Sequence, residues 1–315
     1  MKTKITNSFR LIKKCITLFI TLGSLGFFLR ILVLNFKDIP SLEWNIWMFV
    51  ILVISVIIVG LNNVIGAINW YFLLKDNEVN VAIKNVQIIF LISQFAKYLP
   101  GNVGQYFGRV LWSKENGIPV ALTLHTILLE TIWNSSVAAC LGFLSLVLFI
   151  DGTQNAFLYQ PWQLGIIITL LLLAPWLLTL FINNYCPTVA TWVSKGSQIP
   201  VPKLSTAVIV SSLYLCSFFL MGTILYLQSH SFFQLTGGSI IQVTCLFSIA
   251  WITGFVTPGA PGGIGVREAM IVLLFSPIFG SGPAVGLGVI LRVTTILGDA
   301  LAFLMGLLIK HVFKE

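Results

Sequence analysis

Charged residues are scarce in this chain. Only 9% of its 315 residues are Asp, Glu, Lys or Arg, whereas 57% are hydrophobic. Soluble domains carry about 25% charged residues, so this composition excludes an ordinary soluble protein. Several apolar runs approach or exceed the roughly 20 residues that a helix needs to cross the hydrocarbon core of a bilayer. The sequence therefore predicts an all-α integral membrane protein that crosses the membrane several times.

Motifs for metal, nucleotide and nucleic-acid binding are also missing from the sequence. The five cysteines are scattered and form no C-x-x-C or Cys/His cluster, so neither a metal site nor a disulfide framework is predicted. No Walker P-loop, H-E-x-x-H or G-x-S-x-G motif is present. We therefore expect no cofactor and no nucleic-acid partner, and a transporter rather than an enzyme.

Two Gly- and Pro-rich motifs with the same spacing are the most informative feature that is present. Residues Pro100 to Arg109 and Pro258 to Arg267 both read P-G-x-x-G-x-x-x-x-R. Glycine adopts backbone angles that other residues avoid, and proline removes an amide donor and stops a helix. Each motif is therefore predicted to break a helix inside the membrane. Two such breaks indicate a transporter-like internal repeat, with halves of roughly residues 15–150 and 164–309.

The apolar runs predict about six full spans and two re-entrant or broken helical hairpins in a single domain covering residues 1–315. The spans are expected at about residues 15–34, 45–72, 122–150, 164–182, 204–227 and 284–309. The hairpins are expected at about residues 82–117 and 240–275, with the two motifs at their breaks, and residues 183–203 are expected to form a loop. An eight-span variant with more arms crossing fully is the alternative.

The distribution of Lys and Arg predicts the orientation of the chain. Basic residues are enriched at both ends, whereas the loops at 151–163 and 228–238 contain neither Lys nor Arg. Because cytoplasmic loops carry the excess of basic residues, both termini are expected in the cytoplasm. The first hairpin then enters from the cytoplasm and the second from outside, so the repeat is inverted. The two breaks are expected to approach each other near mid-membrane.

The residues around the breaks are candidates for binding an anion. A helix that restarts after a break offers free N–H groups and the positive end of its dipole, which suit phosphate. The candidates for a lipid headgroup or phosphate are Pro100, Gly101, Asn102, Gly104, Gln105, Arg109, Pro258, Gly259, Pro261, Gly262, Gly263, Gly265, Arg267 and Glu268. The alternative is that each P-G pair only turns a tight hairpin and that its arginine lies among lipid headgroups.

Polar residues within the predicted spans suggest a pathway through the bundle. They are Glu130, Asn134, Arg292 and Asp299. A charge at the centre of a span costs about 2.5 kcal/mol or more, so such groups pair with each other or line a pathway. Arg292 and Asp299 lie on one helix face but, seven residues apart, need a third group to connect them. Glu130 and Glu268 are the expected partners of the arginines, and purely structural ion pairing is the alternative.

These motifs resemble those of the transmembrane region of lysylphosphatidylglycerol synthases. Tyr98 to Gly104 with Arg109, and Pro258 to Glu268, carry the resemblance, which covers nearly the whole chain. The resemblance implies a flippase-like membrane protein, because this region is regarded as a lipid flippase in the two-part members. A separate cytosolic domain transfers the amino acid in those members. Here the chain ends soon after its last predicted span, so we expect that domain and the synthase activity to be absent.

Three functional hypotheses follow from these observations. The first is translocation of an anionic lipid or a polyprenyl-phosphate-linked glycan across the plasma membrane of a prokaryote, in the biogenesis of envelope lipids or polysaccharides. The second is a membrane-embedded glycosyl- or headgroup transferase acting on lipid-linked substrates, with Glu130, Glu268 or Asp299 as the base. The third is a non-catalytic membrane partner of envelope-biosynthesis enzymes.

Overall fold

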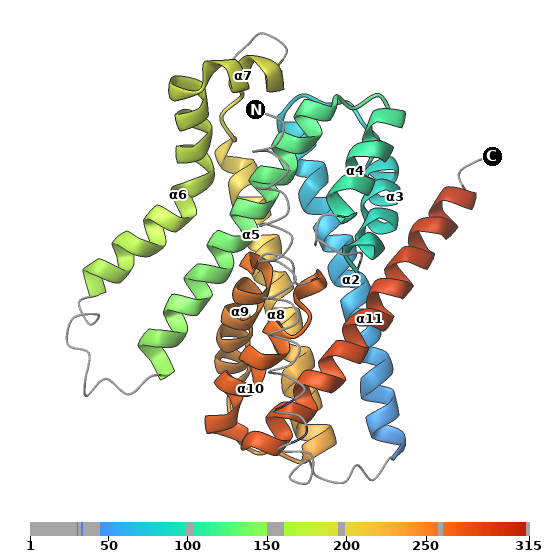
Figure 1. Ribbon diagram of the computed structural model, residues 1–315, viewed down its shortest axis with the longest axis vertical. Coiled ribbons are helices and arrows are strands. Elements are labelled where there is room, and N and C mark those ends of the chain that lie inside the picture. The colour runs from blue at the N-terminus through green and yellow to red at the C-terminus, as the bar shows by residue number, and fades with distance from the viewer. Residues whose placement is uncertain are drawn as a thin grey trace, which may run out of the picture.

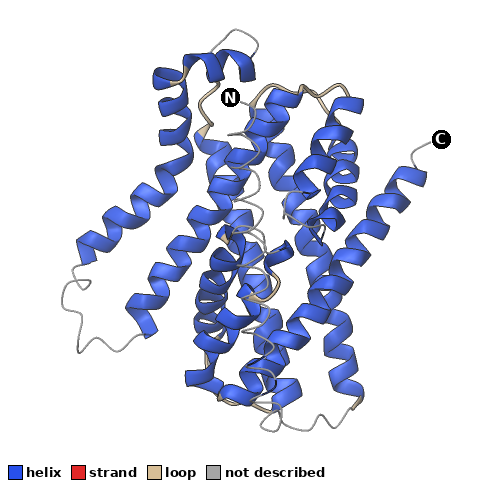
Figure 2. Cartoon of the chain, in the orientation of Figure 1, coloured by secondary structure: helices blue, strands red, loops and turns tan. Residues whose placement is uncertain are grey.

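The computed structural model describes residues 45–98, 104–149, 161–194, 199–257 and 261–312, together with Arg30 and Val33. Every element in these ranges is a helix (Figure 2). Five of the helices are long and apolar enough to cross a membrane. The predicted all-α, multi-pass fold is therefore confirmed. The first predicted span, residues 15–34, lies outside the described residues apart from Arg30 and Val33.

The five long helices coincide with the other predicted spans. They are α2 (Ile46–Asp76), α5 (Val120–Phe149), α6 (Pro161–Tyr185), α8 (Leu204–Phe233) and α11 (Ser281–Val312). Even α6, with 25 residues, is about 38 Å long at 1.5 Å per residue, which exceeds the thickness of the hydrocarbon core. One expectation is corrected: the connector at 183–203 contains a short helix, α7 (Pro187–Ser194). Proline is well suited to the first position of a helix, where its missing N–H has no partner to lose.

Each predicted hairpin consists of two short α-helices separated by a break. The first comprises α3 (Ile83–Gln94), η2 (Phe95–Tyr98) and α4 (Gly104–Glu115); the second comprises α9 (Ile240–Val256), η4 (Pro261–Gly263) and α10 (Val266–Phe279). The α-helical arms have 12 to 17 residues, fewer than the roughly 20 needed to cross the membrane. In Figure 1, α3 and α4 lie in the half of the bundle that contains α7, whereas α9 and α10 lie in the opposite half. These lengths and positions are those of re-entrant hairpins that enter from opposite ends.

The same order of elements occurs twice in the chain: a long helix, two short arms and another long helix. The first set is α2–α3–α4–α5 and the second is α8–α9–α10–α11. The sets pack reciprocally, because α5 lies against α9 and α11 lies against α3, while α2 and α8 pack together. This packing brings the two breaks to the centre of the bundle. The limits of the repeat, residues 15–150 and 164–309, stay a prediction.

Glycines hold the first arm of each hairpin close to the long helix before it. A methyl group on Gly222 of α8 would lie 1.9 Å from Oγ1 of Thr244 in α9. A methyl group on Gly66 of α2 would lie 2.7 Å from the ring of Phe90 in α3. Small residues permit such close helix crossings in membranes. The glycines therefore help to determine the depth at which each break lies.

Candidate functional site

The two helix breaks approach each other through the residues that flank them. A methyl group built on Gly262 of η4 would lie 3.5 Å from Cε1 of Tyr98, the last residue of η2. The prediction that the breaks meet is therefore confirmed for these flanks. Five of the candidate residues lie outside the described residues: Pro100, Gly101, Asn102, Pro258 and Gly259.

The backbone of the second break depends on glycine. Gly262, Gly263 and Gly265 have φ angles of 57°, 72° and 84°, which lie in the region that residues with a Cβ rarely adopt. A Cβ on Gly263 would also lie 3.5 Å from the Cα of Gly254 in α9. The glycines thus allow the chain to reverse tightly and to start α10 beside the end of α9.

The start of α10 carries a carboxylate of its own. Oε2 of Glu268 accepts a hydrogen bond from the N–H of Gly265 at 2.7 Å. Its other oxygen, Oε1, lies 3.3 Å from Nη1 of Arg292 and 3.9 Å from Nη2 of Arg267. The buried Glu268 therefore both caps its helix and partly neutralises two arginines. The expectation that the N–H groups of this break are free for phosphate is thus wrong for Gly265.

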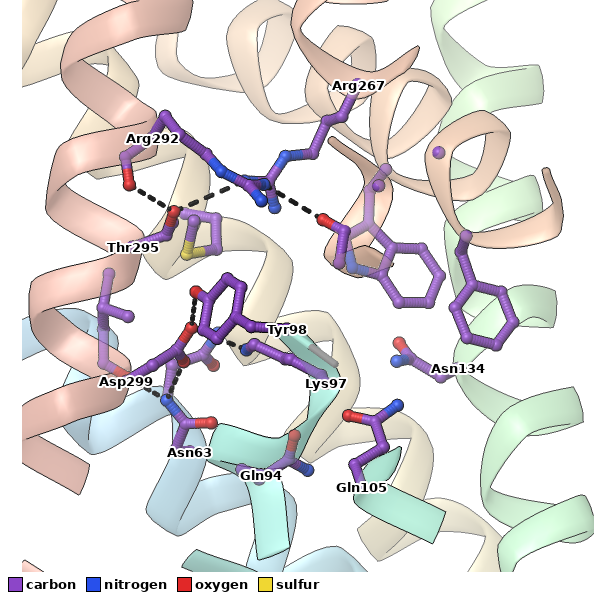
Figure 3. Close-up of a pocket in the computed structure, with 18 of the residues that line it drawn as sticks. Asn63, Gln94, Lys97, Tyr98, Gln105, Asn134, Arg267, Arg292, Thr295 and Asp299 are labelled. Atoms are coloured by element: carbon purple, nitrogen blue, oxygen red, sulfur yellow. Dashed lines mark hydrogen bonds and ion pairs between the residues drawn. The ribbon is translucent and has the colours of Figure 1, made fainter. Parts of the chain in front are cut away.

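A cavity of about 230 Å³ lies where the two breaks meet (Figure 3). Nine of the predicted site and pathway residues line it: Gln105, Arg109, Glu130, Asn134, Gly262, Gly263, Arg267, Arg292 and Asp299. Three other described candidates are not among its lining residues: Gly104, Gly265 and Glu268. Residues from both motifs therefore converge on one cavity.

Two arginines reach the cavity from the second set of helices. Nη1 of Arg292 donates to the carbonyl oxygen of Gly262 at 3.0 Å, and Nη2 of Arg267 donates to Oγ1 of Thr295 at 3.4 Å. Within the described part of the chain, Nε of Arg267 and Nη2 of Arg292 have no hydrogen-bond partner. Guanidinium groups with unused donors are well suited to carboxylate or phosphate oxygens.

Asp299 connects α11 to the first hairpin and to α2. Its Oδ2 lies 2.8 Å from Nζ of Lys97, in an ion pair, and accepts a hydrogen bond from the hydroxyl of Tyr98 (Figure 3). Its Oδ1 accepts a hydrogen bond from Nδ2 of Asn63 at 3.0 Å. The ring centroid of Tyr98 also lies 5.6 Å from the guanidinium carbon of Arg292. Tyr98 is therefore the third group that the spacing of Arg292 and Asp299 requires.

Arg109 occupies a closed environment in the first set of helices. It forms an ion pair with Glu130, and its guanidinium carbon lies 4.9 Å and 4.2 Å from the ring centroids of Trp70 and Phe90. Only 1% of its side chain is exposed. The pairing with Glu130 is the neutralisation expected from the sequence. Arg109 thus joins α4 to α2, α3 and α5, and it is more enclosed than the two arginines of the second set.

Lys97 is the main charged residue of the cavity that the sequence did not indicate. It lines the cavity and pairs with Asp299, three residues before Pro100. A lysine within an apolar run and next to a helix break is costly unless it pairs or serves a pathway, and that signal would have identified it. Thr295 and Gln94 were missed as well, because uncharged polar residues are common in membrane helices.

Comparison with known proteins assigns the chain to a family. The family model for the lysylphosphatidylglycerol synthase TM region matches residues 16–302. The chain belongs to this family. The match to the lysylphosphatidylglycerol synthase TM region includes both hairpins and all the residues that line the cavity, and it links this membrane protein to lipid biogenesis. A search of curated proteins finds no match.

Proposed function

We propose that this protein translocates a lipid with an anionic headgroup across the plasma membrane of a prokaryote. The lipid would be an anionic phospholipid or a polyprenyl-phosphate-linked glycan used in envelope biogenesis. The enzymes that make or consume that lipid would be its functional partners. Membership of the lysylphosphatidylglycerol synthase TM-region family supports a role with lipids. The cations that line the central cavity support an anionic headgroup.

The charge at the meeting point of the two breaks is the observation that carries the proposal. Among the residues that the structure describes, Lys97, Arg267 and Arg292 are paired there with two carboxylates, those of Glu268 and Asp299. One positive charge is therefore in excess, and the arginine–glutamate pair of the first set is neutral by itself. A headgroup phosphate would supply the missing negative charge and accept the unused guanidinium hydrogens.

The arrangement of the hairpins supports movement of the headgroup rather than simple binding. Transporters with inverted repeats place their substrate site between broken helices near the middle of the membrane, and they expose it to each side in turn. Here the hairpins come from opposite ends of the bundle (Figure 1), and residues of both hairpins line the cavity. A shift of either hairpin would open the cavity toward its own side.

The transferase hypothesis receives less support from the geometry. A general base needs a carboxylate that is available to accept a proton from the substrate. The three carboxylates considered as the base, Glu130, Glu268 and Asp299, are each engaged by at least one cation. We therefore favour transport over group transfer.

Replacement of Arg267 by alanine tests the proposed function. The purified protein is reconstituted in liposomes with acyl-labelled NBD-phosphatidylglycerol, and dithionite is added to quench the label in the outer leaflet. We expect wild-type protein to bring inner-leaflet lipid to the quencher and Arg267→Ala to slow this movement roughly ten-fold or more. The reason is that a hydrogen bond to a charged group contributes about 1.5–3 kcal/mol, and 1.4 kcal/mol corresponds to a factor of ten.

The matched control is Lys114→Ala, which removes an exposed cation at the end of α4, away from the cavity. It should translocate lipid at the wild-type rate. Equal rates for the wild type, Arg267→Ala and protein-free liposomes would refute the proposed function.

The orientation of the bundle gives a second test. Lys75, Lys114, Lys203 and Lys310 all lie close to helix ends on the side that contains α7 (Figure 1). We propose that this side faces the cytoplasm, because cytoplasmic segments carry the excess of basic residues. In a cysteine-free background, an impermeant maleimide added to intact cells should label Thr236→Cys between α8 and α9.

The paired variant for this test is Asn116→Cys, in the turn between α4 and α5. Both positions are exposed, so reagent access depends on the side of the membrane and not on burial. Asn116→Cys should react only after the cells are permeabilised. Labelling with the opposite preference would show that the bundle is inserted the other way round.

A further inference from the structure

A group of uncharged amide side chains lines the cavity beside the charged cluster. They are Asn62, Asn63, Gln94, Gln105 and Asn134, contributed by the four helices of the first set. In Figure 3, Gln94, Gln105 and Asn134 lie on the side of the cavity away from Arg267 and Arg292. The site thus has a cationic part and an amide-rich part.

Three of these amides, Asn62, Gln94 and Asn134, have no side-chain hydrogen-bond partner within the described part of the chain. Neither Gln94 nor Asn134 forms a side-chain hydrogen bond there, whereas Asn63 donates to Asp299. Amides that only join helices in a membrane are expected to hydrogen-bond across the helix interface, as Asn63 does. The amides of Gln94 and Asn134 are only partly buried and line the cavity, so their hydrogen-bonding groups are available to a partner that enters it.

The chemistry of an amide indicates the kind of partner. Each amide offers two N–H donors and a carbonyl acceptor, and a hydroxyl group is also both donor and acceptor. An amide pair therefore matches neighbouring hydroxyl groups better than it matches a bare phosphate, which offers acceptors, or an ammonium group, which offers donors. A headgroup with several hydroxyl groups would satisfy both functions of Gln94 and Asn134.

The remaining wall and the size of the cavity agree with a single hydroxylated ring. Trp251 and Phe255 of α9 line the cavity with their rings stacked, 5.0 Å between centroids and 4° between planes. Flat aromatic surfaces suit the C–H face of a sugar or cyclitol ring. The volume of about 230 Å³ is smaller than the roughly 300–1,000 Å³ of pockets for drug-sized ligands, so it suits a headgroup and not a large glycan.

The charges disfavour the aminoacylated headgroup after which the family is named. A lysyl ester adds ammonium groups, and these need carboxylate partners inside the membrane. The carboxylates that line the cavity, Glu130 and Asp299, are already paired with cations. An added ammonium group would also be repelled by Lys97, Arg267 and Arg292.

We infer that the cargo is a lipid whose phosphate carries a polyhydroxylated group, with the phosphate bound at Arg267 and Arg292 and the hydroxyl groups at Gln94, Gln105 and Asn134. This inference rests on the proposed function, because it names the class of headgroup that the same cavity moves. Lipid-linked sugars and cyclitol phospholipids share this chemistry, whereas an aminoacylated phospholipid does not.

A comparison of translocation rates for three headgroups in liposomes tests the inference. Three acyl-labelled NBD lipids are compared: phosphatidylinositol, phosphatidylmethanol, which has the same phosphodiester charge without hydroxyl groups, and lysylphosphatidylglycerol. Wild-type protein should move phosphatidylinositol roughly ten-fold faster than phosphatidylmethanol, because two or more extra hydrogen bonds distinguish them. Lysylphosphatidylglycerol should be the slowest. The double variant Gln94→Leu/Asn134→Leu should bring the first ratio close to one.

Equal rates for phosphatidylinositol and phosphatidylmethanol in wild-type protein would overturn the inference and leave the proposed function intact. If the double variant kept the wild-type ratio of the phosphatidylinositol rate to the phosphatidylmethanol rate, the inference would be overturned as well. Lower stability of the variant does not affect this test, because misfolding lowers both rates together.

Binding of a soluble headgroup separates the two proposals. A ligand that binds the folded state raises the melting temperature of the protein in detergent. Glycerophosphoinositol should raise the melting temperature of the wild type more than dimethyl phosphate does, and this difference should disappear in Gln94→Leu/Asn134→Leu. If no lipid moves but this difference is present, translocation is wrong and the headgroup class is supported. If glycerophosphoinositol and dimethyl phosphate act alike, the headgroup class is wrong.

Discussion

Replacing Arg109 with alanine is expected to destabilise the protein by about 3–5 kcal/mol, because breaking a buried ion pair leaves an uncompensated charge in the interior. Among the described residues, Arg109 is the only cation that forms an ion pair with Glu130, and its side chain is 1% exposed. The change also removes the cation from the faces of Trp70 and Phe90. Equilibrium unfolding of the purified protein in mixed detergent micelles measures the loss directly.

A double variant distinguishes loss of the pair from loss of one partner. Arg109→Met/Glu130→Leu removes both charges and fills the space with apolar side chains, so it should regain most of the stability that Arg109→Ala loses. Lys114→Ala removes a charge from the exposed end of the same helix and should change the free energy of unfolding by less than about 0.5 kcal/mol. If Arg109→Ala were as stable as Lys114→Ala, the structural role assigned to Arg109 would be wrong.

Replacing Asp299 with alanine is expected to have the second-largest effect on stability. Asp299 is 2% exposed and accepts from Lys97, Tyr98 and Asn63, so its loss leaves a lysine, a hydroxyl and an amide without their acceptor. The loss of the charge partner of Lys97 alone costs on the order of 3 kcal/mol for a buried pair. The melting temperature should therefore fall sharply, because the end of the first hairpin is no longer tied to α11.

Asn63→Ala is the graded control for the Asp299 variant. It removes one neutral hydrogen bond to the same carboxylate, which contributes about 0.5–1.5 kcal/mol. Its melting temperature should lie between those of the wild type and Asp299→Ala. The same fall in both variants would mean that Lys97 gains little from the carboxylate, and that the ion pair does not hold the hairpin.

Most of the helical architecture follows from local properties of the chain. The length of each apolar run determines whether it crosses the membrane, and five of the predicted spans coincide with α2, α5, α6, α8 and α11. The two breaks are local as well, since glycine and proline act on the backbone at their own positions. The short helix α7 was missed because its surroundings read as a loop rich in proline and polar residues.

The composition of the site was only partly accessible from the sequence. The arginines and carboxylates could be recognised because an ionisable residue in an apolar run is costly wherever it lies. The amides and Thr295 carry no such signal. The partner of each charge was also undetermined, because several cations and carboxylates occur at similar depths.

Taken by itself, the sequence determined that this is a multi-pass helical membrane protein with two matched helix breaks. The tertiary structure decided which charges pair and which remain available. Asn63 and Asp299 are 236 residues apart, and Tyr98 and Asp299 are 201 apart, so no local pattern joins them. The reciprocal packing of α3 on α11 and of α5 on α9 brings them together. That packing encloses Arg109 with Glu130 and leaves Arg267 and Arg292 beside the cavity with one carboxylate between them.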